Sequence, residues 1–160
     1  MKEESKIIIV TGASSGIGKE VTKKFCCNGW KVVALGRSRE KLSKLKKECK
    51  GGKVELIQRN LCKKSAEKLI VKKVYKKYQR IDAVFVGAGF GIGGNIGEKQ
   101  MKRADEMVRI NLLSLFYFLE AITPIFKKQM SGHLVGVGSV AGIKAAPGFA
   151  LYSATKFGMR

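Results

Sequence analysis

The chain has 160 residues, 45% of them hydrophobic and 28% charged, which is ordinary for one globular domain with a real hydrophobic core. Its 32 basic residues against 12 acidic ones give a formal net charge of +20, which favours attraction to nucleic acid, phosphorylated cofactors or an acidic carrier protein. The sequence has no nucleic-acid module signature, no signal-peptide pattern and no apolar stretch suited to a bilayer. We therefore expect a cytoplasmic protein without a membrane span and without a specific nucleic-acid ligand.

The four cysteines, Cys26, Cys27, Cys49 and Cys62, do not form a metal-binding pattern. No C-x-x-C occurs, and the single His133 has no cysteine near it in sequence, so we expect no metal site. The adjacent pair Cys26-Cys27 is typical of a reducing compartment rather than of a disulfide framework.

The first predicted strand, over 6–11, leads through a glycine-rich loop into a helix over 16–28. Ile17, Val21 and Phe25 recur at i+4 steps and mark the apolar face of this helix. A strand, a tight turn and a helix N-terminus form a site where a pyrophosphate can lie against free backbone N–H groups. The residues expected to hold it are Gly12, Ser14, Ser15, Gly16, Ile17 and Gly18.

The residues that follow the second predicted strand, over 30–35, bear on the choice between the two nicotinamide dinucleotides. An acidic residue there would bind the ribose hydroxyls and repel a 2′-phosphate, but the chain reads Leu35-Gly36-Arg37-Ser38-Arg39. Gly36 leaves room and Arg37 can offer a guanidinium to a phosphate, so NADP(H) is favoured over NAD(H). The alternative is that Arg37 and Arg39 are ordinary surface residues in the first turn of a helix.

That second helix can be capped by Ser38, extends to about Cys49 and buries Leu42 and Leu45. The next elements alternate between strand and helix, which predicts a parallel α/β sheet. They are a strand over 54–58, a helix over 66–78, a strand over 81–86 and a glycine-rich segment from Gly87 to Gly97.

A long helix is predicted over 101–129, in two pieces, with Pro124 kinking its last part, and a fifth strand over 134–138 follows. The last predicted helix begins at Tyr152. Tyr152 and Lys156 lie four residues apart, so they share one face of this helix. An ammonium beside a phenol favours the phenolate, which suits proton transfer.

Four motifs occur in the order and spacing of one known family. They are T-G-x-x-x-G-x-G from Thr11 to Gly18, Asn111, Ser139 at the end of the fifth strand, and Y-x-x-x-K from Tyr152 to Lys156. With these motifs the whole chain resembles the short-chain dehydrogenase/reductase family. The resemblance implies one NAD(P)-binding domain over residues 1–160 with a Rossmann-like, doubly wound parallel α/β fold and strand order 3-2-1-4-5.

The resemblance also implies the reaction, which is hydride transfer between nicotinamide C4 and a carbonyl or secondary alcohol carbon. In such a site Tyr152 exchanges a proton with the substrate oxygen, and Ser139 polarises the same oxygen. Lys156 supports the Tyr152 phenolate and binds the nicotinamide ribose, while Asn111 holds a water that links Lys156 to solvent. The cofactor carries the difficult step, and the protein orients and polarises.

Two segments depart from the family pattern. After the third strand the family usually has Asp-Val at the adenine, and this chain has Asn60-Leu61, whose amide can still bind an adenine edge. After the fourth strand the family's Asn-Asn-Ala-Gly becomes Val86-Gly87-Ala88-Gly89, which keeps the close backbone approach but lacks an Asn side chain that stiffens the sheet. The remaining residues expected to bind the cofactor are Arg37, Ser38, Asn60, Leu61, Gly87, Ala88, Gly89, Tyr152 and Lys156.

Family members continue past the Y-x-x-x-K helix with two more strands and a loop that closes over substrate and nicotinamide. The resemblance therefore implies a C-terminally incomplete domain, and we expect low or no turnover from the free-standing 160-residue chain. The expected substrate is a small carbonyl or alcohol, or an acyl-carrier-bound substrate whose acidic carrier would suit Lys127-Lys128. The full-length form is expected to be a homo-oligomer. A non-catalytic dinucleotide-binding or redox-sensing module, and a basic nucleic-acid-binding domain, are the open alternatives.

Overall fold

The structure is a computed structural model that describes residues 5–63, 65–94 and 101–160. Its strands are β1 (Ile7–Thr11), β2 (Lys31–Gly36), β3 (Val54–Gln58), β4 (Ala83–Val86) and β5 (His133–Gly136). Its α-helices are α1 (Gly16–Cys27), α2 (Arg39–Glu48), α3 (Ala66–Tyr78), α4 (Ala104–Val108), α5 (Ser114–Gln129) and α6 (Ala150–Phe157). Two 3-10 segments, η1 (Met101–Arg103) and η3 (Val140–Gly142), and a π-helical segment, η2 (Arg109–Leu113), complete the described elements.

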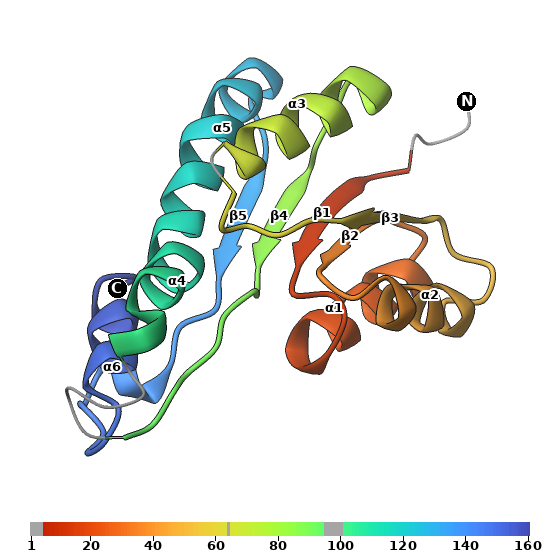
Figure 1. Ribbon diagram of the computed structural model, residues 1–160. Coiled ribbons are helices and arrows are strands. Elements are labelled where there is room, and N and C mark those ends of the chain that lie inside the picture. The colour runs from red at the N-terminus through yellow and green to blue at the C-terminus, as the bar shows by residue number, and fades with distance from the viewer. Residues whose placement is uncertain (1–4, 64, 95–100) are drawn as a thin grey trace.

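The strands form one parallel sheet in the order β3-β2-β1-β4-β5. Its central strand is β1, where Ile9 pairs with Val33 of β2 on one side and with Val84 of β4 on the other. Helices α1 and α2 lie on one side of the sheet, and α3 and α5 lie on the other (Figure 1). The predicted doubly wound α/β fold and its strand order are confirmed.

Each face of the sheet has its own hydrophobic core, because successive side chains of a strand point to opposite faces. Ile7 and Ile9 pack in the core that α3 and α5 cover, whereas Ile8 and Val10 pack in the core of α1 and α2. Full burial of each such side chain contributes about 1.5–3 kcal/mol. β1 therefore fixes the glycine-rich loop that follows it next to the segment 87–94 that follows its neighbour β4, which we call the β4 loop.

The second helix follows the prediction closely, and the first does not. Ser38 Oγ accepts a hydrogen bond from Lys41 N at the start of α2, and Leu42 and Leu45 are buried as predicted. In α1 the predicted apolar face is wrong at Ile17, which is 62% exposed. The residues of α1 that are buried against the sheet are Gly18, Thr22 and Cys26.

The long helical stretch Met101–Gln129 departs from α-helical geometry at η2, around Asn111, and α5 continues through Pro124 to Gln129. This stretch is long and apolar enough to cross a membrane, and the core helices of soluble proteins can have the same length and composition. Phe118 and Ile122 are fully buried in the core, whereas Phe116 and Tyr117 are exposed. The expected lack of a membrane span and the expected homo-oligomer stay predictions.

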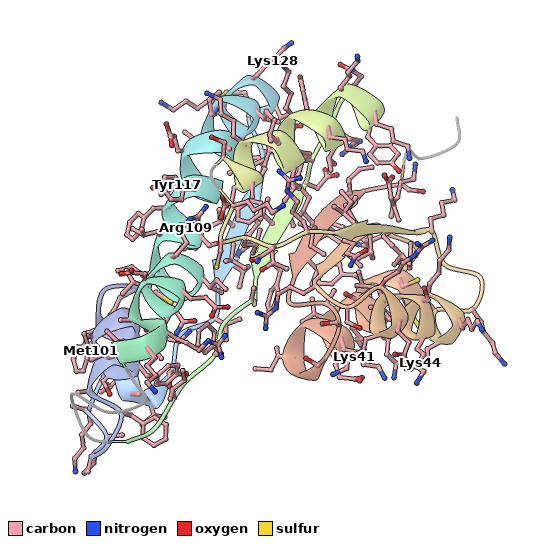
Figure 2. The ribbon with its side chains drawn as sticks, in the orientation of Figure 1. Lys41, Lys44, Met101, Arg109, Tyr117 and Lys128 are labelled. Carbon is pink, nitrogen blue, oxygen red and sulfur yellow. The ribbon has the colours of Figure 1, made fainter. Side chains whose placement is uncertain are left out.

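Many lysines lie on outer helix faces. Figure 2 shows Lys41 and Lys44 on α2 and Lys128 near the end of α5, and all three are exposed. Of the glycine-rich segment predicted over Gly87 to Gly97, residues 95–97 lie outside the described residues.

Candidate functional site

A pocket opens at the carboxyl ends of β1, β2 and β4, where the strand order reverses between β1 and β4. This is the place at which open α/β sheets bind ligands. It brings together predicted cofactor residues from the glycine-rich loop, the end of β2 and the β4 loop. Its lining is Gly12, Ser14, Ser15, Leu35, Gly36, Arg37, Arg59, Leu61, Ala88, Gly89, Phe90 and Ile110.

Close backbone contacts explain two glycines of the loop. Gly12 has a φ of +69°, and a Cβ there would lie 2.9 Å from both Ala88 N and Gly87 O. A Cβ on Gly18 would lie 2.5 Å from Gly12 O, so the first turn of α1 can pack on the loop only with glycine at this position. These contacts fix the N-terminus of α1 beside the pocket, with no acidic residue in its first turn.

The end of β2 contributes Arg37 to the pocket. Its Nη1 lies 3.1 Å from Glu106 Oε1 of α4, and the Arg37 side chain is 61% exposed. Glu106 also accepts a hydrogen bond from Arg103 Nε at 2.6 Å. We call these three residues the rim bridge. Ser38 caps α2, and Asn60 Oδ1 accepts from Cys62 N at 2.9 Å.

The β4 loop connects the pocket to the predicted catalytic residues. A Cβ on Gly89 would lie 3.2 Å from Asn111 Oδ1 and 4.0 Å from Lys156 Nζ, and one on Gly91 would lie 3.2 Å from the Tyr152 ring. The glycines of this loop therefore allow it to lie directly against the site. The structure brings Asn111, Tyr152 and Lys156 to one place, beside the pocket.

The Asn111 side chain connects the β4 loop to α6. It accepts a hydrogen bond from Phe90 N at 3.0 Å, and its Nδ2 donates to Phe90 O at 2.8 Å and to Thr155 Oγ1 at 3.2 Å. Asn111 is 2% exposed. It holds the helix that carries Tyr152 and Lys156 in place, and the water that the family resemblance implies stays a prediction.

Ser139 lies at the start of η3 and its Oγ accepts a hydrogen bond from Ala141 N at 3.1 Å. The same short segment packs on α6, because a Cβ on Gly142 would lie only 2.6 Å from Lys156 O. Ser139 is thus placed by a segment in contact with the Tyr152 helix. Its hydrogen bond to a substrate oxygen stays a prediction.

Lys156 is buried, and its Nζ donates to Val137 O at 2.7 Å and lies 5.8 Å from the centre of the Tyr152 ring. Burial lowers the pKa of Lys156 below its ordinary value of 10.5, because an ammonium is poorly solvated there. A charged group with few solvent contacts acts strongly on its neighbours. The arrangement therefore places a buried positive charge beside the Tyr152 ring.

This pKa shift predicts a pH-dependent stability difference between the wild type and Lys156→Met. The lowered pKa means that the folded protein releases the Lys156 proton at a lower pH than the unfolded chain does. The wild type should therefore gain stability relative to Lys156→Met as pH rises through the folded-state pKa, with no further gain above about 10.5. Urea unfolding of both proteins between pH 7.5 and 10.5 measures this difference; a constant difference would contradict the assignment.

Several lining residues have no counterpart among the residues predicted from sequence. Arg59, Phe90 and Ile110 line the pocket, and Arg59 Nε is buried without a hydrogen-bond partner in the described part of the chain. Leu61 was predicted to contact the cofactor, and Arg59 lies two residues before it. In extended backbone, side chains two residues apart point to the same side, so the prediction could have been extended to Arg59. Gly91 could have been found from its place in the glycine-rich segment.

The chain is similar in sequence and in structure to known proteins of one family. The sequence model of the family described as short chain dehydrogenase matches residues 6–160. A 3-oxoacyl-[acyl-carrier-protein] reductase of Thermotoga maritima is 36% identical over 161 residues, which cover 99% of this chain and 65% of that protein. The chain spans about 65% of the length of the curated relatives that it matches first.

Two solved structures carry different dinucleotides. A metagenomic short-chain oxidoreductase in complex with NADP superposes with a TM-score of 0.91 at 29% identity, covering 96% of this chain and 71% of that one. An NAD+-bound xylitol dehydrogenase superposes with a TM-score of 0.89 at 25% identity, covering 99% of this chain and 62% of that one. The fold alone therefore accommodates either dinucleotide, and the choice depends on individual residues.

Proposed function

This chain belongs to the short-chain dehydrogenase family of oxidoreductases, and we propose that its site transfers hydride between NADP(H) and a carbonyl or secondary alcohol carbon. The observation that carries the proposal is the convergence of Asn111, Tyr152 and Lys156 on the glycine-rich β4 loop, next to the pocket at the N-terminus of α1. A helix N-terminus and acid–base groups at one sheet edge are what a dinucleotide-dependent reaction requires.

The residues at the pocket fit a dinucleotide. Gly12 lets the glycine-rich loop lie against the β4 loop, and Gly18 lets the first turn of α1 pack on Gly12. Arg37 and Arg59 supply positive charge in the pocket lining. We propose that Gly12, Ser14, Ser15, Gly16, Ile17 and Gly18 hold the pyrophosphate. Arg37 and Ser38 would bind the adenosine 2′ side, Asn60 and Leu61 the adenine, and Gly87, Ala88 and Gly89 the central part of the cofactor.

When bound, the nicotinamide supplies or accepts the hydride at C4, and the chain's residues act on the substrate oxygen. In the reductive direction Tyr152 donates its phenolic proton to that oxygen, which leaves an alcohol and a Tyr152 phenolate. Lys156 stabilises the phenolate and Ser139 donates a hydrogen bond to the same oxygen. Asn111 keeps the helix of Tyr152 and Lys156 in register with the β4 loop. The presence of Ser139, Tyr152 and Lys156 argues against a non-catalytic dinucleotide-binding or redox-sensing module.

The substrate class proposed first is a ketone or a 3-oxoacyl group on a carrier. The 36% identity to a 3-oxoacyl-[acyl-carrier-protein] reductase supports this class. Lys127 and Lys128 are exposed at the end of α5, where an acidic carrier would find opposite charge.

Replacement of Arg37 tests the proposed cofactor. Arg37→Asp should weaken NADPH binding at least tenfold and leave NADH binding equal or stronger, because a charge-assisted hydrogen bond of about 1.5–3 kcal/mol is replaced by repulsion. Titration followed by nucleotide fluorescence measures both affinities. Lys41→Asp, which makes the same charge change on the outer side of α2 (Figure 2), is the matched control and should leave their ratio unchanged. Equal loss of NADPH and NADH affinity in Arg37→Asp would contradict the proposed preference.

A further inference from the structure

The rim bridge connects Arg37 with Phe90, two residues that line the pocket and follow different strands. Arg37 lies at the end of β2 and pairs with Glu106, one helical turn before the lining residue Ile110. Glu106 in turn pairs with Arg103, whose guanidinium lies over the ring of Phe90, 4.4 Å from its centre. Phe90 lines the pocket. The bridge thus crosses the rim of the pocket from β2 to the β4 loop, through α4.

The central member of the bridge is a carboxylate held by two guanidiniums. The Glu106 side chain is 25% exposed, whereas Arg37 and Arg103 are 61% and 46% exposed. The Arg37 contact is the longer one, 3.1 Å against 2.6 Å for Arg103 Nε. Arg37 can therefore leave the bridge while Glu106 keeps Arg103 as its partner.

We infer that Glu106 is a specificity-determining residue, whose carboxylate competes with the adenosine 2′-phosphate for Arg37 and so limits the preference for NADP(H). This inference rests on the proposed function, because it takes Arg37 to be the 2′-phosphate ligand. A phosphate that binds Arg37 either replaces the Glu106 carboxylate or shares the guanidinium with it, and in both cases it approaches a second negative charge. NADH has no 2′-phosphate, so its binding does not meet this repulsion.

The inference predicts that Glu106→Gln, a substitution of almost the same shape, increases selectivity for the phosphorylated ligand. The affinity for 2′,5′-ADP relative to 5′-AMP should rise about threefold to fivefold, the size of one exposed ion pair. The NADPH to NADH affinity ratio should rise by the same factor. The rise should shrink between 20 mM and 500 mM salt, because the contact is partly exposed and screened.

The experiment is calorimetric titration of the protein with these ligands, using Glu40→Gln as the matched control. Glu40 pairs with Lys44 on the outer side of α2, and both are highly exposed, so this control makes the same charge change away from the pocket. Arg37→Ala and the Arg37→Ala/Glu106→Gln double variant complete the set. In the Arg37→Ala background, Glu106→Gln should have less than half of its effect.

The outcomes distinguish a failure of the Glu106 competition from a failure of the proposed NADP(H) binding by Arg37. In one outcome, Arg37→Ala weakens 2′,5′-ADP binding while Glu106→Gln leaves the ratio of 2′,5′-ADP affinity to 5′-AMP affinity unchanged or lowers it. That result refutes the competition, and the NADP(H) proposal stands. If Arg37→Ala has no effect on either ligand, the proposed role of Arg37 fails and the inference fails with it. A rise in the ratio with Glu106→Gln alone, absent in Glu40→Gln, supports the competition.

Discussion

Tyr152→Phe should reduce the rate of NADPH-dependent carbonyl reduction by at least a hundredfold while NADPH affinity changes less than twofold. The substitution removes only the hydroxyl that donates the proton, and a positioned acid–base group contributes about 10²–10⁴ in rate. The ring that packs against Gly91 remains, so the β4 loop and the pocket should keep their shape. Single-turnover absorbance at the NADPH band, with nucleotide binding measured separately, distinguishes the two effects.

The matched control for this prediction is Tyr75→Phe. Tyr75 lies on α3 and packs, partly buried, on the core away from the pocket, so loss of its hydroxyl should leave the rate within twofold. A Tyr152→Phe protein that keeps more than a tenth of the wild-type rate would show that another group supplies the proton.

Arg109→Met should destabilise the fold by about 3–5 kcal/mol, since it leaves a buried carboxylate without its partner. Arg109 Nη1 and Nη2 each lie 2.8 Å from an oxygen of Glu67, and Glu67 has no exposed surface. The Glu67 carboxylate also raises the pKa of Arg109. Figure 2 shows Arg109 close to Tyr117, and its guanidinium lies 4.5 Å from the centre of that ring. The pair joins α3 to the π-helical segment that carries Asn111.

Urea unfolding of Arg109→Met, compared with Lys44→Met, measures this effect. Lys44 and Glu40 form an exposed pair 3.0 Å apart, whose loss should cost less than 1 kcal/mol. A destabilisation below 1 kcal/mol in Arg109→Met would mean that the Glu67 carboxylate is satisfied without Arg109.

Sequence alone predicted the elements whose signals are local. The strand Val54–Gln58 and the helix capped by Ser38 were predictable because the Gly51-Gly52 turn and an N-cap act within a few residues. The buried face of α1 was predictable only in part, since Val21 and Phe25 pack on the core but Ile17, which the apolar period also favours, is exposed. The close approach of Gly18 to Gly12 instead turns the small residues Gly18, Thr22 and Cys26 toward the sheet.

Features that depend on contacts between residues far apart in the chain also could not be predicted from the sequence. The long helix departs from α-helical geometry at η2, around Asn111, whose side chain bonds to Phe90 and Thr155, 21 and 44 residues away. Pro124, where the sequence predicts a kink, lies inside α5, which continues to Gln129. The contact between Arg37 and Glu106 spans 69 residues and exists only because the strand order brings β2 and α4 to the same pocket.

The proposed reaction moves a hydride to a carbonyl carbon and a Tyr152 proton to its oxygen. The most direct measurement is single-turnover transfer from NADPH carrying deuterium at C4 to a 3-oxoacyl thioester or a ketone. The protein that carries this chain should yield an alcohol with deuterium on the new carbinol carbon, and Tyr152→Phe should slow the appearance of that label at least a hundredfold. NADPH that binds but leaves no deuterium in any carbonyl substrate, or labelling that is equally fast in Tyr152→Phe, would contradict the account.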